Sequence, residues 1–266
     1  MRSLDFFDTH PVFTHGEFVA AHTAGRRSKR TSNNLLARHL AAGRLLRVRR
    51  GLYATVLRGV DPERASVDPY HVATKLADDA VVAYHAALQF HGRAYSVWRR
   101  FHYLTGERKR PFSFRGMEIV PVQAPVAVRS LPDLGGSVIN ERHAGGFVRV
   151  TTLERALVDV LDAPYKGGSW EEIWRSLEMV EFFDLDAVIN YALRLRSALA
   201  VARVGFFLEQ HREELMVEDK HLDALRAHAP EQPRYLDGKR EPGKLVPGWN
   251  LVVPERVLKR SWQEMT

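Results

Sequence analysis

The sequence predicts an α+β protein in which a small basic N-terminal domain precedes a larger mixed α/β domain. The chain of 266 residues is longer than one average domain and can bury a sizeable core. Excess positive charge is confined to its first quarter, where the hydrophobic pattern also changes from helical to strand-like. We therefore divide the chain into a domain over residues 1–60, a linker over 61–69 and a domain over 70–266.

The composition indicates a globular protein of a reducing compartment. Hydrophobic residues make up 45% and charged residues 27% of the chain, and there is no cysteine. This excludes thiolate nucleophiles, disulfide bridges and zinc sites built on sulfur. The sequence contains no long apolar run that predicts a membrane span, and residues 1–10 lack the apolar core of a signal peptide. We expect a cytoplasmic protein without a membrane partner.

The charge is unevenly distributed along the chain. Residues 1–60 contain eleven basic and three acidic side chains, a net charge of +8, whereas the other 206 residues contain 28 basic and 29 acidic side chains, a net charge of −1. A basic module attached to a nearly neutral body is typical of proteins that bind a polyanion through one domain. Charge alone leaves a second reading open, namely a basic surface that only keeps the domain soluble.

Two short helices are predicted in the basic domain. Thr14 is a suitable N-cap for the first, and Glu17 would complete a capping box three residues later. This helix is expected to end near Gly25, because glycine commonly terminates helices. The basic segment 26–32 follows as a turn, and the second helix then continues to a stop at Gly43.

One face of the second helix carries a polar stripe. At 100° per residue, Arg30, Asn34 and Arg38 fall within an arc of about 80°, and Leu36 and Leu40 lie on the opposite side, where they can pack on the first helix. Arginine can pair bidentately with guanine, and asparagine with adenine. The stripe is therefore a candidate for reading base edges.

Residues 44–54 have the pattern of a β-hairpin. Two short apolar strands flank a turn at Arg49-Arg50-Gly51, in which the glycine can adopt a positive φ. A two-stranded hairpin is not stable alone in water, so we expect Leu46, Val48 and Leu52 to pack under the helices. The arginines at the tip are placed to contact backbone phosphates.

This order of helix, turn, basic helix and basic hairpin is typical of a winged helix-turn-helix, which predicts binding to double-stranded DNA. The stripe on the second helix would read bases in the major groove. The hairpin arginines would contact phosphates or the minor groove, and the segment before the helix would anchor phosphates. The predicted DNA-binding residues are Arg26, Arg27, Lys29, Arg30, Thr31, Asn34, Arg38, Arg47, Arg49 and Arg50.

Three stretches of the chain resemble one known family, the AbiEi-type antitoxins. Residues 12–56, and especially 43–54 (GRLLRVRRGLYA), are similar to the winged domain of that family. Residues 83–92 (AYHAALQFHG) resemble the segment that follows it, and residues 150–159 (VTTLERALVD) resemble a helix start in its C-terminal domain. Together the stretches cover about a quarter of the chain in the order of the family. Residues 26–32 are longer and more basic than the compact turn of that family.

The resemblance implies a bacterial antitoxin and transcriptional repressor of a type IV, or abortive-infection, toxin–antitoxin pair. Such a protein would bind inverted repeats in the promoter of its own operon. Its C-terminal domain would counter a nucleotidyltransferase-type toxin encoded beside it, with or without direct contact. The resemblance implies no enzymatic activity and no cofactor.

The larger domain is predicted from alternating patterns. Helices are expected over 70–76, 85–90, 170–182, 185–196 and 198–214 and from residue 151 onward, and strands over 97–104, 112–114, 117–122 and 147–150. The aromatic residues at helical spacing are expected in the core, with a surface for a partner as the alternative. They are Trp170, Trp174, Phe182, Phe183, Phe206 and Phe207.

The sequence contains no persuasive catalytic constellation, so we do not expect an enzyme. His85, His91, His102 and His143 are expected to be ordinary hydrogen-bonded histidines rather than metal ligands. Two alternative functions remain. A DNA-processing enzyme could combine Asp133 with Glu218 in a nuclease-like site, or a repressor could sense a small molecule through its larger domain.

Overall fold

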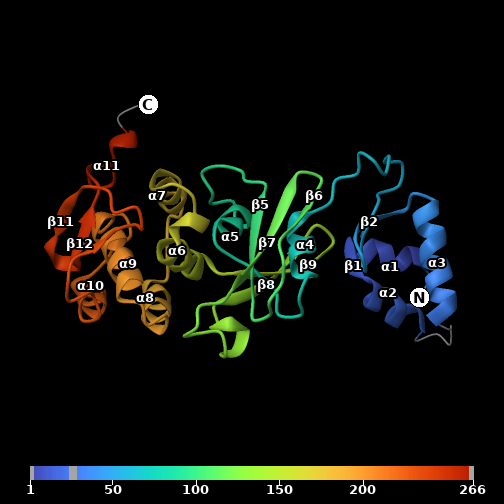
Figure 1. Cartoon of the computed structure of the whole chain (residues 1–266), viewed down its shortest axis with the longest axis horizontal. Coiled ribbons are helices and arrows are strands. Elements are labelled where there is room, and N and C mark those ends of the chain that lie inside the picture. The colour runs from blue at the N-terminus through green and yellow to red at the C-terminus, as the bar shows by residue number, and fades with distance from the viewer. Residues whose placement is uncertain (1–2, 24–28, 264–266) are drawn as a thin grey trace.

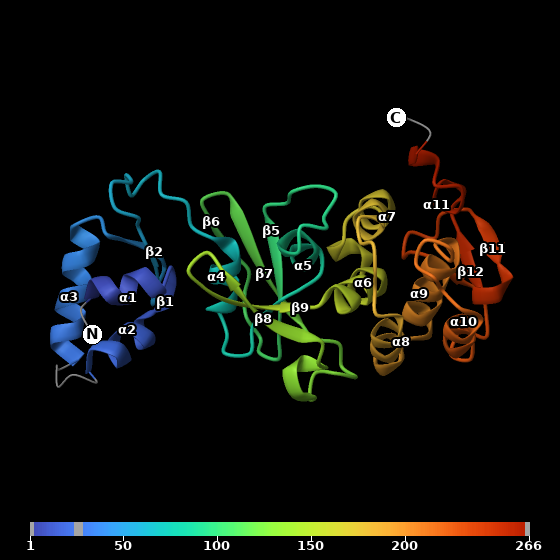
Figure 2. The ribbon, with the colours of Figure 1, turned by 180° about the vertical axis from the view of Figure 1, so that it is seen from behind.

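Three parts of the chain follow one another along the long axis of the molecule (Figure 1, and Figure 2 from behind). This computed structural model describes residues 3–23 and 29–263. Residues 3–56 lie at one end, a six-stranded sheet lies in the middle, and a mainly helical part with a small sheet lies at the other end. The predicted α+β class is confirmed.

The N-terminal part combines three helices with a three-stranded sheet. In chain order its elements are α1 (Ser3–Thr9), β1 (Val12–Thr14), α2 (His15–Thr23), α3 (Lys29–Ala41), β2 (Leu45–Arg49) and β3 (Leu52–Thr55). The sheet is antiparallel with the order β1-β3-β2. Both predicted helices and the hairpin are present, and the sequence did not predict α1 and β1.

The predicted capping box at the start of α2 is formed. The Glu17 backbone N–H donates to the Thr14 hydroxyl over 3.2 Å, and the Thr14 backbone N–H donates to the Glu17 carboxylate over 2.7 Å. The same carboxylate pairs with the Lys75 ammonium of the central part. One side chain therefore both starts a helix and ties the N-terminal part to its neighbour.

The packing of the hairpin corrects a prediction. Leu45 and Tyr53 pack in the aromatic core under the helices, whereas Val48 and Leu52 belong to the large core that continues into the central part, and Leu46 packs against that core. The predicted face was therefore the wrong one. The sheet is covered on both faces, and every residue of β3 except its last is buried. No polar position in Leu52-Tyr53-Ala54 indicates which face meets the helices.

The central part is a mixed sheet with the strand order β6-β7-β5-β4-β9-β8. The pairs β5–β7 and β4–β9 are parallel, and the other neighbouring pairs are antiparallel. Two helices pack against it. Its elements are α4 (Pro69–Thr74), β4 (Val81–Val82), α5 (His85–Phe90), β5 (Arg100–Thr105), β6 (Phe112–Phe114), β7 (Met117–Gln123), β8 (Val138–His143) and β9 (Gly146–Thr151).

The C-terminal part begins directly after β9 with a series of capped helices. The side chains of Thr152, Ser169, Asp184 and Ser197 each accept a hydrogen bond from a backbone N–H in the first turn of the helix that follows. The elements are α6 (Leu153–Asp162), α7 (Trp170–Glu178), α8 (Leu185–Arg194), α9 (Ala198–Gln210), α10 (Asp219–Arg226), β10 (Arg234–Tyr235), β11 (Lys244–Val246), β12 (Leu251–Val253) and α11 (Glu255–Leu258).

The small sheet has the strand order β10-β12-β11, and the 3-10 turn Pro247–Trp249 before β12 packs against α9. Trp249 is fully buried there, and its ring lies so close to Gly205 that a Cβ at that glycine would come within 2.2 Å of it. Five of the six aromatic residues in the predicted cluster are buried, which confirms the core interpretation for them. Phe182 differs, with 66% of its surface exposed.

None of the helices in residues 3–23 and 29–263 has both the length and the apolar character that crossing a membrane requires.

Candidate nucleic-acid interface

Helix α3 presents the predicted stripe to solvent. Arg30, Asn34 and Arg38 are exposed, whereas Ser32 and Leu36 on the other side of the helix are buried. Ala37 and Ala41, whose short side chains are also exposed, lie on the same face of α3. Short residues on an exposed helix face allow the backbone to come close to a flat or grooved partner surface.

The first turn of α3 is electrostatically unfavourable for a helix. It contains Lys29 and Arg30 and no acidic residue, although a helix N-terminus carries a partial positive charge and favours carboxylates. The exposed cations therefore do not stabilise the helix. A polyanion placed at this end would interact favourably with both the side chains and the helix dipole.

The tip of the β2–β3 hairpin has the predicted turn. Gly51 has a φ of 80°, and Arg47, Arg49 and Arg50 are exposed. The Arg49 guanidinium carbon lies 5.6 Å from the ring centroid of Phe112 in β6. The hairpin tip therefore rests against the central sheet, with Arg50 beside this contact.

A second basic segment lies next to the hairpin. The loop between β5 and β6 contains Arg108, Lys109 and Arg110, all exposed, and leads directly into Phe112 beneath Arg49. Of these three cations, only Lys109 pairs with a carboxylate among the described residues, that of Glu107 at 2.8 Å. Counting charge by domain missed this loop, because acidic residues elsewhere in 61–266 cancel it in the total.

The remaining predicted residues fall into two groups. Arg26 and Arg27 lie outside the described residues. Lys29 and Thr31 were predicted in the turn before the helix but belong to α3 (Lys29–Ala41), as Arg30 of the predicted stripe does.

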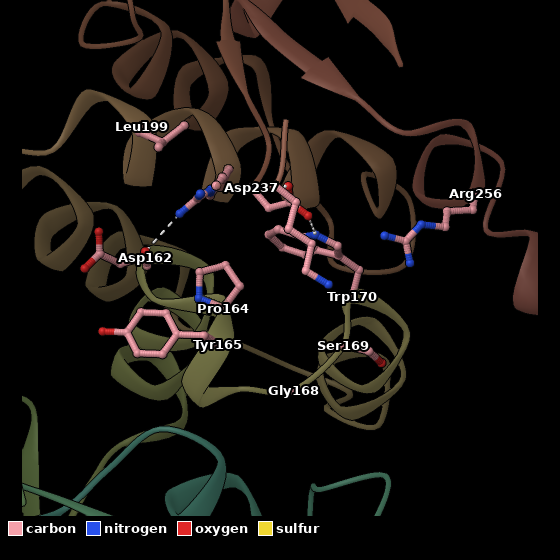
Figure 3. A pocket seen from close by; sticks show the side chains of 12 residues that line it. Asp162, Pro164, Tyr165, Gly168, Ser169, Trp170, Leu199, Asp237 and Arg256 are labelled. Carbon is pink, nitrogen blue, oxygen red and sulfur yellow. Dashed lines mark hydrogen bonds between the residues drawn. The ribbon is translucent and has the colours of Figure 1, made fainter. Parts of the chain in front are cut away.

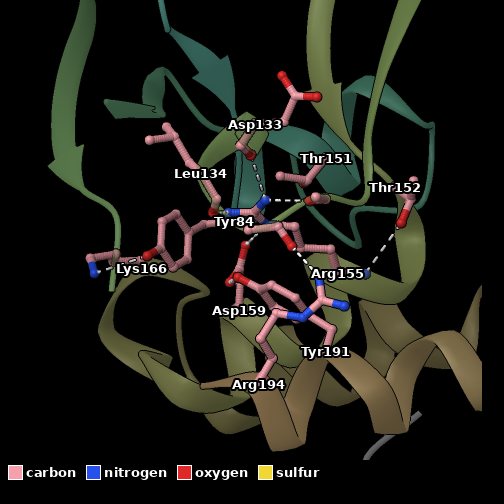
Figure 4. Close-up of polar contacts among 12 residues, drawn as sticks. Tyr84, Asp133, Leu134, Thr151, Thr152, Arg155, Asp159, Lys166, Tyr191 and Arg194 are labelled. Atoms are coloured by element: carbon pink, nitrogen blue, oxygen red, sulfur yellow. Dashed lines mark hydrogen bonds and ion pairs between the residues drawn. The ribbon is translucent and has the colours of Figure 1, made fainter. Parts of the chain in front are cut away.

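Figure 4 shows a buried polar cluster built on the stretch 150–159. Arg155 is fully buried, and its guanidinium donates to the backbone carbonyls of Asp133, Leu134 and Gly136 over 2.5–3.3 Å and to the Asp159 carboxylate over 3.4 Å. The Tyr191 hydroxyl donates to the other Asp159 oxygen over 2.9 Å. The arginine thereby fixes the loop before β8, so the structure gives this stretch a structural role.

Asp159 is the acidic residue of this cluster, and its pKa depends on the groups around it. Burial raises the pKa of Asp159, and the Arg155 charge opposes that rise.

Three of the four histidines that the sequence singled out have the expected protein partners, whereas the buried Nδ1 of His102 has none among the described residues. The His85 Nε2 lies 2.9 Å from a Glu172 carboxylate oxygen, and the His91 Nε2 lies 2.8 Å from the Thr151 carbonyl. His143 contacts the Asp68 carboxylate over 2.7 Å. In the part of the chain that the structure describes, no three histidine or acidic side chains are grouped so that they could hold a metal ion.

His102 should make the protein sensitive to acid. Burial lowers its pKa to about 4, from 6.5. Between these pH values the unfolded chain binds a proton at His102 that the folded protein does not bind. The contribution of neutral His102 to the free energy of unfolding is therefore fully present above pH 6.5 and is lost as the pH decreases towards 4. At about 1.4 kcal/mol per pH unit, the loss by pH 5 should be about 2 kcal/mol. Urea unfolding at pH 7, 6 and 5 measures it. The His102→Phe variant should show a shallower slope, and equal slopes would contradict this assignment.

The structure places the two nuclease-like carboxylates on different parts of the molecule. Asp133 lies in a 3-10 turn beside the central sheet and pairs with Arg149 at 2.8 Å. Glu218 is the N-cap residue of α10 in the C-terminal part and pairs with Lys220. The two do not form the acidic pair that a metal-dependent nuclease requires.

A cavity of about 830 Å³ lies at the junction between the N-terminal and central parts. Arg44 and Thr55 line it from one side, and Asp68 and Gly145 from the other. The segment that crosses the junction is held by Arg115, whose guanidinium donates to the carbonyls of Ala65 and Pro62 over 2.5 and 2.7 Å. The predicted linker is thus anchored to the central part at these two carbonyls.

Comparisons with known proteins give a fold likeness. No family model matches the chain, and no curated protein matches its sequence. Among solved structures, the chain is similar to the RV2827C protein from Mycobacterium tuberculosis, with a TM-score of 0.57 and 16% sequence identity. The match covers 100% of this chain and 94% of the other. At this identity the likeness concerns the fold alone.

Proposed function

We propose that the N-terminal part is a winged helix-turn-helix that binds double-stranded DNA. In this proposal α2 and α3 form the helix-turn-helix, α3 enters the major groove, and the β2–β3 hairpin is the wing. The observation that carries it is the row Arg30, Asn34 and Arg38 on the exposed face of a helix whose other face is buried. The cations in the first turn of α3 support the same proposal, because they disfavour the isolated helix and favour a polyanion.

We further propose that the protein is a transcriptional repressor of its own operon and the antitoxin of a type IV toxin–antitoxin pair. The support is the resemblance of residues 12–56, 83–92 and 150–159 to AbiEi-type antitoxins. In this proposal the DNA target is the promoter, read at inverted repeats, and the toxin is of the nucleotidyltransferase type. The protein would act in the cytoplasm and would need no catalytic residue of its own.

The DNA-binding proposal is tested by titrating the full chain onto a promoter fragment from its own gene. A fragment of equal length and base composition serves as the control. The full chain is used because the hairpin packs on the central part, so residues 1–60 alone would expose Val48 and Leu52. We expect protection of a defined segment of the promoter at concentrations that leave the control open. Equal protection of both fragments would contradict sequence-specific repression.

The wing makes a prediction about salt. If Arg50 contacts a phosphate, Arg50→Ala should reduce the slope of log K against log salt concentration by about 0.9. Arg58→Ala is the matched control, since it removes the same charge from an exposed residue that lines the junction cavity instead. Fluorescence anisotropy at 50–200 mM salt, a range over which about 10³-fold changes are usual for several phosphate contacts, measures both slopes. An unchanged slope for Arg50→Ala would remove the hairpin tip from the interface.

The antitoxin proposal needs a separate test. The full chain and the neighbouring toxin are expressed together, each from a promoter that the protein does not control, and surviving cells are counted. We expect rescue by the full chain, and also by the Asn34→Ala, Arg38→Ala double variant, because both residues are exposed in the N-terminal part. Failure of the full chain would contradict the antitoxin proposal and leave DNA binding intact.

A further inference from the structure

The C-terminal part contains a cavity of about 550 Å³, at the far end of the molecule from α3. Figure 3 shows that its wall comes from several elements: Asp162 at the end of α6, Trp170 at the start of α7, Leu199 in α9, Asp237 after β10 and Arg256 in α11. Small-molecule sites have volumes of about 300–1,000 Å³ and often lie where several elements converge. The cavity has the size and the setting of such a site.

A buried arginine in this wall keeps one donor free. Arg203 is 6% exposed, and its guanidinium donates through Nε to the Leu236 carbonyl and through Nη1 to the carbonyls of Leu161 and Asp162, over 2.7–3.0 Å. Among the described residues, no hydrogen bond uses Nη2. The Nη2 atom is also not fully buried, so it stays open to the cavity that Arg203 lines. Burial lowers the pKa of Arg203 to about 10, which leaves it charged at neutral pH.

Two carboxylates, those of Asp162 and Asp237, line the cavity together with three cations, Arg203, Lys239 and Arg256. Both carboxylates act on Arg203 through space, but among the described residues neither forms an ion pair with its guanidinium. The Asp237 carboxylate accepts from the Trp170 indole N–H over 3.2 Å and from the Lys239 backbone N–H over 2.9 Å. Arg256 pairs with Glu241 at 2.6 Å. Within residues 3–23 and 29–263, no carboxylate forms an ion pair with the Lys239 ammonium. Arg203 and Lys239 are therefore the two cations that can receive an anion.

The rest of the wall suits an apolar body. Pro164, Tyr165, Trp170 and Leu199 all line the cavity. Figure 3 shows the Tyr165 ring beside Pro164. Tyr165 is 78% exposed, which is unusual for so large a ring, and gives a flat ligand an accessible face to pack on.

We propose that this cavity binds a small organic anion, with one carboxylate or phosphate group on a flat apolar body. The anionic group would accept hydrogen bonds from Arg203 Nη2 and from the Lys239 ammonium, and the flat body would lie against Tyr165 and Leu199. Charge-assisted hydrogen bonds of this kind are the strong ones in proteins, particularly where the donor is removed from water. The site is independent of the proposed DNA interface.

The test is isothermal titration calorimetry of the full chain with two anions and their neutral counterparts. AMP and adenosine form the phosphate pair, and benzoate and benzyl alcohol form the carboxylate pair. We expect saturable binding of at least one anion, about tenfold tighter or more than its neutral counterpart. The pair that responds identifies the anionic group. No saturable binding of either anion, or equal binding of the neutral compounds, would overturn the proposal.

Two variants locate the binding. Leu199→Trp, at a partly exposed position, should fill the cavity and abolish binding, and Lys239→Glu, at an exposed position, should weaken it about tenfold or more. Lys220→Glu on α10 makes the same charge change away from the cavity and should bind like the unmodified chain. Thermal unfolding of each variant checks that it is folded. Unchanged affinity in both Leu199→Trp and Lys239→Glu would place the anion elsewhere and contradict the proposal.

Discussion

Replacement of Arg155 by methionine should be the most destabilising single change in this account. The variant leaves Asp159 buried without its charged partner and removes hydrogen bonds to three carbonyls of the loop before β8. Breaking a buried ion pair by removing one partner costs about 3–5 kcal/mol. We expect a loss of that size in the free energy of unfolding, measured by urea titration at pH 7.

Arg194→Ala is the matched control for this prediction. Arg194 also donates to the same loop, to the Gly135 carbonyl over 2.7 Å, but from the surface of α8 (Figure 4). Its removal should cost about 1 kcal/mol or less, because water can replace an exposed donor. Equal losses in the two variants would mean that burial of Arg155 adds nothing to its contribution.

The second large effect concerns the exposed face of α3. Asn34→Ala and Arg38→Ala should each weaken binding to the preferred DNA site by about 1–3 kcal/mol and relax the preference at one base pair. Folding should be almost unchanged, since both side chains are exposed. Binding to a set of duplexes that differ by single base pairs measures both quantities.

Helix α8 offers a control with the same geometry. Asn190 and Arg194 are exposed and four residues apart, as Asn34 and Arg38 are. The double variant Asn190→Ala, Arg194→Ala should bind DNA like the unmodified chain. If the α3 variants lose affinity for all duplexes equally, then these residues contact phosphates rather than bases.

Local signals were the part of the fold that could be predicted from the sequence. The capping box of Thr14 and Glu17 and the glycine turn at Gly51 each act within a few residues, and each is formed. The periodicity of α3 also predicted correctly that Leu36 is buried and that the polar stripe on the opposite side is exposed.

The sequence could not predict strands that lack an alternation of polar and apolar residues, because nothing then separates the buried face from the exposed one. Strand β4 has only two residues, Val81 and Val82, and strand β8 is partly exposed along its length, so neither has a strand pattern. The side of the hairpin that meets the central part is decided by tertiary packing of Val48 and Leu52. For the same reason the sequence did not predict that the hairpin tip rests on Phe112.

Buried arginines were the functional and structural residues that sequence reasoning missed. Arg203 interrupts the apolar run 198–208, and Arg155 lies among the apolar positions of α6. A single arginine in such a run indicates a guanidinium that is buried with acceptors of its own. The carbonyls that serve as its acceptors come from distant loops and cannot be found from the sequence.

The chain without cysteine permits a direct test of where α3 lies on DNA. Ala37→Cys introduces a single thiol on the exposed face of α3, and an iron–EDTA reagent attached to it cleaves DNA only nearby. Gln232→Cys places the same reagent on an exposed residue of the C-terminal part. With the full chain bound to its promoter, we predict cleavage confined to a few base pairs inside the protected segment from position 37, and none from position 232. Protection of the promoter without cleavage from position 37 would contradict the account.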